Sequence, residues 1–303
     1  MIELIDSKLF QIKPTMNQKS AELPFIGVDI GGSHITAAHV DCTTYTLIDN
    51  TMKRERVSSM DEADVIINSW VSALSSLVQK SGLNSSKIGI AMPGPFDYQE
   101  GISLMKGMQK YDALYGMNIR AILSEKLGIP PEDIIFINDA EAFLRGELAS
   151  GAAADFEKAI GVTLGTGLGS TSNCKGETVD VNRAFVPFLD SIAEEYISTR
   201  WFLKRYKELT GKEIRNVEEL LGTDCNDTKA RLFDEFATNL ASFLNDFIAD
   251  EQPQVLIIGG NIARTWDHFI DQLEERIIDK SVVIRRTEMW EDAALVGAAC
   301  TWI

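Results

Sequence analysis

The first residues that could do chemistry lie in a hairpin pattern near the N-terminus. An apolar run from Phe25 to Ile30 contains one acidic residue, Asp29. The run breaks at Gly31-Gly32, and short alternating residues resume from Ile35 to Val40, which predicts two strands around a glycine turn. Glycine leaves backbone N–H groups unshielded, so an anion can approach them closely. At this point a plain tight hairpin and a site for Mg²⁺-bound polyphosphate both remain open.

A second glycine turn repeats the first about 130 residues later in the chain. The segment Gly161 to Thr166 parallels Gly27 to Gly32, because each is an apolar strand that runs into a turn of small residues. Two matched segments indicate two related domains that face each other. One such turn is only a turn, but two of them can form a clamp around a phosphate.

An Asn-Asp pair stands between a predicted strand and a predicted helix. The apolar run Ile134 to Ile137 delivers Asn138 and Asp139, and the apolar spacing of a helix follows directly. Asparagine and aspartate are favoured helix N-caps, so capping alone would explain the pair. Both interpretations, a cap and a functional pair, stay open on these residues alone.

The elements that must position these groups alternate between extended and helical patterns. Strands are predicted within Thr43–Val57, at Lys87–Met92, at Gln254–Ile258 and at Val282–Ile284. Helices are predicted at residues 61–81 with Gly82 as C-cap, at 118–127, directly after Asp139, at 191–209, at 228–250, at 264–279 and at 291–300. Residues 1–22 are expected to form at most one short strand or helix, and residues 213–227 a polar connection.

A rigid loop, Pro93-Gly94-Pro95, ends the strand at Lys87–Met92. The carboxyl end of a strand is the usual ligand side of an open α/β sheet, although a plain rigid turn is an equal alternative. The loop-rich stretch that follows offers polar groups that could reach a ligand, namely Lys106, Gln109, Lys110 and Tyr111.

Composition restricts the class of protein. The 303 residues are 45% hydrophobic and 24% charged, which is ordinary for a globular chain long enough for two domains. The net charge of −16 disfavours nucleic acid and anionic membranes as partners. No secretory signal or membrane-spanning stretch is evident, so we expect a cytoplasmic protein without membrane contact.

The cysteines and histidines indicate no metal centre. The four cysteines have no short spacing, so we expect reduced thiols in the core and neither a zinc site nor disulfides. The three histidines form no ligand pattern. Common nucleotide and hydrolase motifs are also missing: no Gly-Lys-Ser/Thr follows a glycine turn, a strand pattern follows Gly31-Gly32 where a dinucleotide fold needs a helix, and no Gly-x-Ser-x-Gly occurs.

Five motifs in order over Phe25 to Ile303 resemble the ROK family of bacterial sugar kinases and regulators, within the actin-like ATPase and sugar kinase superfamily. They are Asp29–His34 (first phosphate motif), Met92–Pro95 with Asp97 (sugar loop), Asn138–Ala140 (catalytic motif), Leu164–Gly169 (second phosphate motif) and Gly259–Asn261 (adenosine motif). The resemblance implies a two-domain α/β, ribonuclease H-like fold with the active-site cleft between the domains. Residues 1–138, completed by the C-terminal helix 290–303, would form the smaller domain, and residues 139–289 the larger one.

The resemblance also implies roles, position by position. Asp139 would be the general base that takes the proton of a sugar hydroxyl, and Asp29 would position Mg²⁺ or its waters. ATP would be held by Gly31, Gly32, Ser33, His34, Gly165, Thr166, Gly167, Gly259, Gly260 and Asn261, and the sugar by Pro93, Gly94, Asn138 and Glu194. The general demands of phosphoryl transfer, alignment and charge stabilisation, suit these residue types.

The sequence departs from the family pattern at three places. The closely spaced cysteines of the family's zinc motif are absent before Glu194, and so is the Gly-Glu-x-Gly-His stretch whose glutamate and histidine bind the sugar. His34 stands where lysine is frequent. These differences affect the identity of the sugar more than the type of reaction.

The resulting prediction is an ATP- and Mg²⁺-dependent kinase of a hexose or amino sugar, similar to glucokinases. The alternatives are a sugar-binding regulator without catalysis, and another ATPase or kinase of the superfamily. Members of the family are often dimers, so a homodimer is allowed, although no stretch of the sequence identifies an interface.

Overall fold

The computed structural model describes residues 25–81, 86–108 and 110–303. The element expected within residues 1–22, the C-cap at Gly82 and the side chain of Gln109 lie outside the described residues.

The first sheet is built around the predicted N-terminal hairpin. Its strand order is β3-β2-β1-β5-β8, and β4 also pairs with β2. The bounds are β1 Phe25–Ile30, β2 His34–Asp41, β3 Thr46–Leu47, β4 Lys53–Arg56, β5 Ile88–Met92 and β8 Ile134–Asn138. β1 and β2 are antiparallel, whereas β5 and β8 run parallel to β1. Helices α1 (Ala63–Ser81) and α2 (Ile119–Leu127) cover one face with apolar side chains.

The second sheet repeats this plan, as the matched glycine turns predicted. Its order is β11-β10-β9-β14-β15, with an antiparallel hairpin β9-β10 and with β14 parallel to β9. The bounds are β9 Lys158–Leu164, β10 Leu168–Cys174, β11 Glu177–Asp180, β14 Val255–Gly259 and β15 Val283–Arg286. Two small hairpins are β6 Phe96–Asp97 with β7 Ile102–Ser103, and β12 Pro187–Phe188 with β13 Ser191–Ile192.

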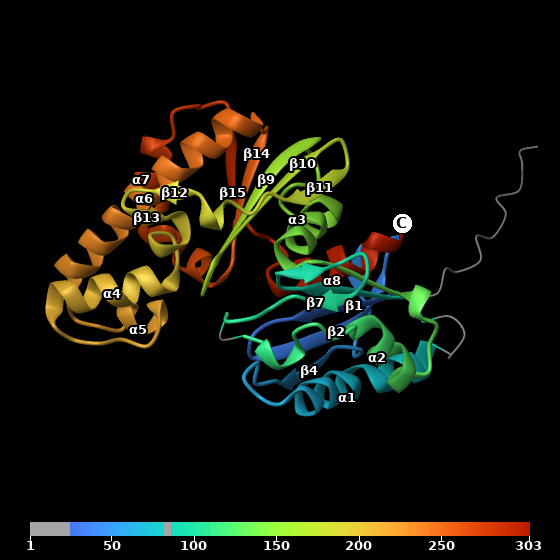
Figure 1. Cartoon of the computed structure of the whole chain (residues 1–303). Coiled ribbons are helices and arrows are strands. Elements are labelled where there is room, and N and C mark those ends of the chain that lie inside the picture. The colour runs from blue at the N-terminus through green and yellow to red at the C-terminus, as the bar shows by residue number, and fades with distance from the viewer. Residues whose placement is uncertain (1–24, 82–85, 109) are drawn as a thin grey trace, which may run out of the picture.

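Two helices cross between the sheets (Figure 1). α3 (Asp139–Ser150) follows β8 of the first sheet but packs on β9 and β10 of the second. α8 (Glu291–Ala299) follows β15 of the second sheet but packs on β1 and β5 of the first. Glycine makes this packing possible: a Cβ on Gly297 would lie 1.8 Å from Ala142 O, and one on Gly146 would lie 2.1 Å from Ala293 O. The two backbones therefore touch, and each half of the molecule is completed by a helix from the other.

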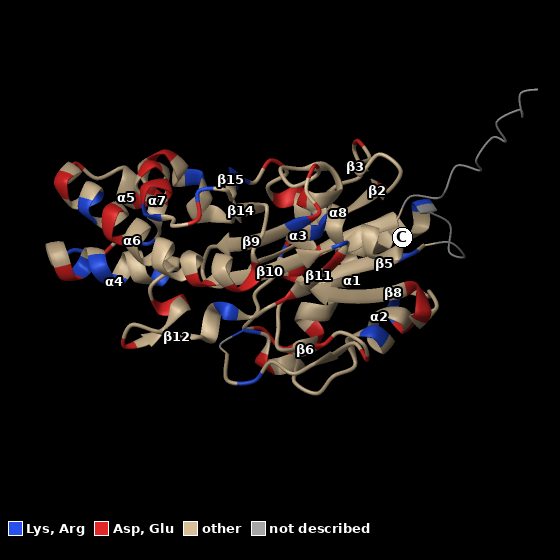
Figure 2. Cartoon of the chain, turned by 90° about the horizontal axis from the view of Figure 1, so that it is seen from above, with Lys and Arg blue, Asp and Glu red and all other residues tan. Residues whose placement is uncertain are grey.

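The outer face of the second sheet carries the largest apolar core. α6 (Asn226–Glu251) supplies its wide stripe of buried phenylalanine and leucine residues, as predicted, and α4 (Thr199–Thr210), α5 (Val217–Leu221) and α7 (Ile270–Arg276) pack around it. Short 3₁₀ helices span Asp112–Leu114, Pro131–Asp133, Arg183–Phe185, Ala193–Glu195, Asn261–His268 and Cys300–Trp302. Charged residues gather on helices and loops, whereas the central strands are mostly uncharged (Figure 2).

Four expectations about local structure were wrong. The helix expected from residue 191 begins only at Thr199, because residues 191–192 pair with β12 as β13 and a 3₁₀ turn follows. The polar connection contains α5, whose first turn is capped by the Asn216 side chain. The helix expected at residues 264–279 is a 3₁₀ helix kinked at Thr265 and then α7. None of the cysteines is a core residue: Cys174 is exposed, and the half-exposed Cys42 and Cys300 place their Sγ atoms 3.1 Å apart.

A buried carboxylate ties the crossing helices to the loop before α8. Glu147 of α3 is fully buried and accepts hydrogen bonds from the backbone N–H groups of Ala152 (2.7 Å) and Met289 (3.0 Å) and from the Thr287 hydroxyl. In Glu147→Gln an NH₂ group would face donors, so we expect the free energy of unfolding to fall by about 2–3 kcal/mol. Chemical denaturation would measure this, with the exposed Glu157→Gln as control. An effect no larger than the control's would contradict the role of the carboxylate.

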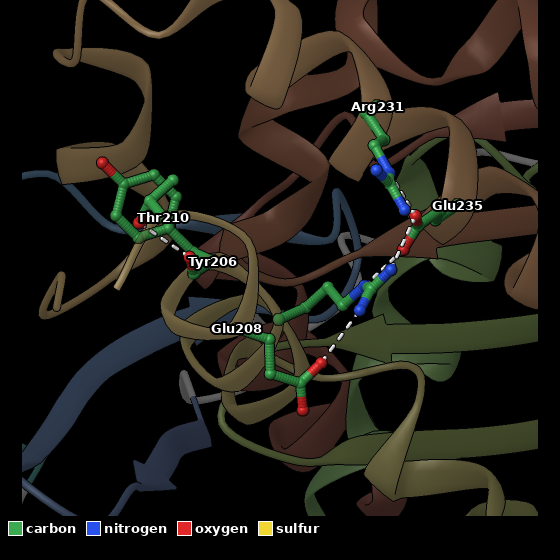
Figure 3. A network of polar contacts seen from close by, with 6 residues as sticks. Tyr206, Glu208, Thr210, Arg231 and Glu235 are labelled. Atoms are coloured by element: carbon green, nitrogen blue, oxygen red, sulfur yellow. Dashed lines mark hydrogen bonds and ion pairs between the residues drawn. The ribbon is translucent and has the colours of Figure 1, made fainter. Parts of the chain in front are cut away.

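An ion-pair network joins α4 to α6 (Figure 3). The Arg205 guanidinium donates to both oxygens of Glu235, at 2.7 and 3.0 Å, and to Glu208 at 2.9 Å, while Arg231 donates to Glu235 at 2.8 Å. The hydrogen bond from Arg205 is the main cause that lowers the pKa of Glu235 below its usual 4.5.

Glu235→Gln is expected to lower the free energy of unfolding by about 1 kcal/mol at pH 7 and low salt, because these groups are only partly shielded from water. A carboxylate whose folded pKa is depressed stabilises the fold above its unfolded pKa, so the difference should disappear as the pH falls below 4.5. The difference in the free energy of unfolding should also become smaller in 0.5 M salt, because salt screens exposed charges over a Debye length of about 3–10 Å. Denaturant titrations at pH 7 and below pH 4.5, each at low salt and in 0.5 M salt, test this. As a control, Glu213→Gln should change nothing measurable, because Glu213 and its partner Lys207 are both exposed.

Candidate active site

The first glycine turn is a rigid loop with outward-facing backbone donors. Gly31 N donates to His34 O (2.9 Å), and Gly31 O and Gly32 O accept from the Tyr111 hydroxyl (2.6 Å) and from Ser59 N (3.3 Å). Within the described part of the chain, the N–H groups of Gly32 and Ser33 have no hydrogen-bond acceptor. The Ser33 hydroxyl lies 2.9 Å from Nδ1 of His34. The carbonyl side of the turn is thus fixed, while its N–H side is open to an anion.

The second turn has the same character. Gly165 N donates to Gly167 O (3.0 Å), and Gly165 O accepts from Thr199 N at the start of α4 (2.8 Å). Thr166 N and Gly167 N have no acceptor among the residues described, and a Cβ on Gly165 would meet no atom within 4 Å. Each sheet therefore presents an open pair of backbone donors at the tip of its central hairpin.

Asn138 and Asp139 lie where β8 ends and α3 begins. The Asn138 side chain caps the helix: its Oδ1 accepts from Ala140 N (2.8 Å) and Glu141 N (3.2 Å). Its Nδ2 donates to the Tyr98 hydroxyl (3.2 Å), which in turn donates to Met92 O (3.0 Å). Capping therefore accounts for Asn138 and leaves one amide hydrogen, whereas the Asp139 carboxylate is bonded only to the adjacent Ala140 N among the described contacts.

Mutual repulsion identifies the carboxylates that share the site. Burial, followed by the negative charges of Asp139 and Glu291, raises the pKa of Asp29 to about 7. The nearby Lys110 and Arg54 oppose this shift. Partial burial is the main cause that raises the pKa of Asp180, and Asp139 adds to it. Asp139, at the start of α3, thus acts electrostatically both on Asp29 of β1 and on Asp180 of β11.

This group of acids suits a divalent cation bound together with a phosphate ligand. Mg²⁺ is commonly held by one or two carboxylates, with the remaining ligands from water and substrate phosphates. No group of three or more histidine, cysteine or acidic residues poised for a metal occurs within the described ranges. Asp29 and the open N–H groups beside it provide both parts of the requirement.

The predicted adenosine motif adjoins the second turn. Gly260 has a φ of +83°, and a Cβ there would lie 2.5 Å from Leu164 O, so only glycine fits against the end of β9. Asn261 begins the next 3₁₀ helix. In the first half, Pro93 and Gly94 follow β5, and a Cβ on Gly94 would lie 3.3 Å from the Tyr98 hydroxyl beside Asn138.

Glu194 lies against the second glycine turn, on a 3₁₀ turn where the sequence predicted a regular helix. Its Oε2 accepts from Leu168 N (2.9 Å), and its Oε1 is paired with Arg200. The sequence interpretation missed Arg200 on α4, Tyr98 beside β6, and Asp180 on β11. Lys110 and Tyr111, by contrast, were singled out as polar residues of a loop-rich stretch.

The paired sheets, the crossing helices and the two facing hairpin turns define a two-domain α/β protein with the actin-like ATPase fold. A glucokinase of Streptomyces griseus, solved with glucose and AMPPNP, shares this fold with a TM-score of 0.73 and 20% identity, over 92% of this chain and 98% of that one. The chain belongs to the ROK family, whose sequence profile matches residues 25–179, just over half of its length.

Curated relatives cover almost the whole chain. It is 23% identical to the glucokinase of Thermotoga maritima, over 92% of this chain and 96% of that protein. It is also 23% identical to the N-acetyl-D-glucosamine kinase of Pectobacterium carotovorum, over 89% of this chain and 93% of that protein. Across residues 25–81, 86–108 and 110–303, no helix has the length and apolar character needed to cross a bilayer.

We expect Asp29 to lower the stability of the ligand-free protein and to contribute to the binding of Mg²⁺. Its carboxylate is partly buried beside other acids, so Asp29→Asn should raise the melting temperature of the ligand-free protein by about 2–4 °C, equivalent to roughly 1 kcal/mol. The same variant should lose the stabilisation that Mg²⁺ gives in the presence of ADP. Thermal melts with and without Mg²⁺-ADP test both, with the exposed Asp155→Asn as control. A lower melting temperature for Asp29→Asn would show that the carboxylate stabilises the apo fold.

Proposed function

We propose that the protein transfers the γ-phosphoryl group of ATP to a hydroxyl of a hexose or an amino sugar, with Asp139 as general base. The observation that carries this proposal is the position of Asp139, which begins α3 and acts electrostatically on Asp29, the acid that precedes the first open turn. The kinase activities named for both curated relatives support it, as do the glucose and the ATP analogue in the Streptomyces structure.

In the reaction, a sugar hydroxyl oxygen forms a bond to the γ-phosphorus while the bond from that phosphorus to the ADP oxygen breaks. The proton of the hydroxyl passes to a carboxylate oxygen of Asp139. The backbone N–H groups of Gly32, Ser33, Thr166 and Gly167 hold the phosphates and stabilise the charge of the transition state. ATP supplies the phosphoryl group and Mg²⁺ offsets its negative charge, with Asp29 placed to hold the ion or its waters.

The remaining proposed contacts follow from the same geometry. The sugar would lie by Pro93 and Gly94, where Asn138 still has one amide hydrogen to donate, and Glu194 would offer a carboxylate that Leu168 N and Arg200 already hold in place. Gly31, His34, Gly165, Gly259, Gly260 and Asn261 would complete the nucleotide site. In this proposal residues 1–138 with 290–303 and residues 139–289 are two domains that close on the sugar and exclude water.

A coupled ADP-release assay over a panel of hexoses and N-acetylated hexosamines tests the proposal. We expect sugar-dependent turnover in the wild type and a fall in kcat of roughly 10²–10⁴-fold in Asp139→Asn, because that variant keeps the shape but loses the base. The exposed Glu132→Gln is the control for changes near this strand.

Either of two results would contradict the proposal and favour another function. Sugar binding detected by thermal shift, with no turnover on any sugar, would indicate a sugar-binding regulator. ADP release that does not depend on sugar would indicate another ATPase of the same fold.

A further inference from the structure

Tyr111 attaches the loop after β7 to the first glycine turn. Its ring is fully buried and packs edge-on against Trp70, with ring centroids 5.5 Å apart. Its hydroxyl donates to Gly31 O at 2.6 Å, and its backbone N donates to Ser59 O at 2.7 Å. These contacts hold the neighbouring residue, Lys110, against the turn independently of any contact made by its own side chain.

The Lys110 side chain lies beside Gly32, one of the two residues of that turn with an open N–H group. A Cβ built on Gly32 would lie 3.9 Å from Lys110 Cε and 4.0 Å from Ser59 Oγ. The positive charge of Lys110 also acts on Asp29, whose pKa it lowers against the larger effect of burial. The ammonium group is therefore close both to the anion-binding backbone and to the carboxylate proposed to hold Mg²⁺.

Three other cations are already engaged. Arg54 is paired with Glu291, Arg200 is paired with Glu194, and the Lys106 ammonium lies over the Tyr115 ring, 4.8 Å from its centroid. Lys110 is partly buried, and no carboxylate of the described residues lies within ion-pair distance of it. A solvated surface lysine would explain the missing ion pair, but it would not explain a position fixed beside Gly32.

We propose that Lys110 is a further catalytic residue, whose ammonium group binds the terminal phosphate of ATP and stabilises the phosphoryl group during transfer. This inference rests on the proposed kinase function. Charge on the transferred group is spread over its outer oxygens, and a fixed cation in contact with them lowers the barrier. Lysine suits this task because its ammonium is a compact point charge on a flexible stem that can follow the moving group.

Nucleotide binding separates this role from a structural one. Calorimetric titration of Lys110→Met should show binding of Mg²⁺-AMPPNP weakened at least 10-fold more than binding of Mg²⁺-ADP, because only the former has a terminal γ-phosphate. In the ADP-release assay, kcat/KM should fall about 10²–10³-fold, as for the loss of other charge-stabilising groups. Lys110→Arg should retain part of both properties, and the exposed Lys126→Met, on α2, should stay within about twofold of the wild type.

The outcomes distinguish this inference from the function on which it rests. If the wild type phosphorylates a sugar but Lys110→Met binds both nucleotides as tightly as the wild type, or loses both equally, the assignment to the terminal phosphate is wrong and the kinase proposal stands. If the wild type binds neither nucleotide, the kinase proposal fails and the role of Lys110 fails with it. Should Lys110→Met not fold, Lys110→Gln is titrated in its place under the same criteria.

Discussion

The contact on which the rest of the structure depends is the crossing of α3 and α8. Gly146 and Gly297 let the two backbones touch, and Gly27 brings β1 onto the same helix, since a Cβ there would lie 2.0 Å from Leu295 O. Any larger side chain at these three positions would force the helices and the sheet apart. Glu147 then fixes the loop before α8 through three hydrogen bonds. Two sheets that share no strand are joined in this way by backbone packing and one buried carboxylate.

This crossing sets the geometry of the active site. Asp139 is the first residue of α3, and Asp29 lies on β1, the strand against which α8 packs. A displacement of either helix would therefore change the separation of the two carboxylates. Burial, followed by repulsion from Asp139, raises the pKa of Asp29, and a bound cation would relieve this repulsion. The same rigidity that completes the fold keeps these acids together.

Local patterns in the sequence were enough to predict most elements, but not the contacts between them. Both hairpins, α1, α6 and the Asn-Asp junction follow from apolar periodicity and glycine turns, and the structure confirms them. The predicted start of the helix at residue 191 was wrong, because residues 191–192 pair with β12 and no periodicity reveals this pairing. The packing of Gly146 on Ala293 joins residues that are distant in the sequence, and no single segment records it. Lys110 and Gly32 are also distant in the sequence, so only the structure shows that they lie side by side.

Two of the three departures from the family pattern are accompanied by other structural features at the same places. His34 stands where lysine is frequent, and the structure places another cation, Lys110, beside the same turn from a different loop. Residues 185–193 contain no cysteine, yet the segment before Glu194 is held by the β12-β13 hairpin and by the edge-on contact of Phe188 with Tyr196, whose ring centroids lie 5.6 Å apart. What a site requires is charge and a fixed backbone at a given point, and neither requires a particular residue in the sequence. The chemistry can therefore persist where the motif does not.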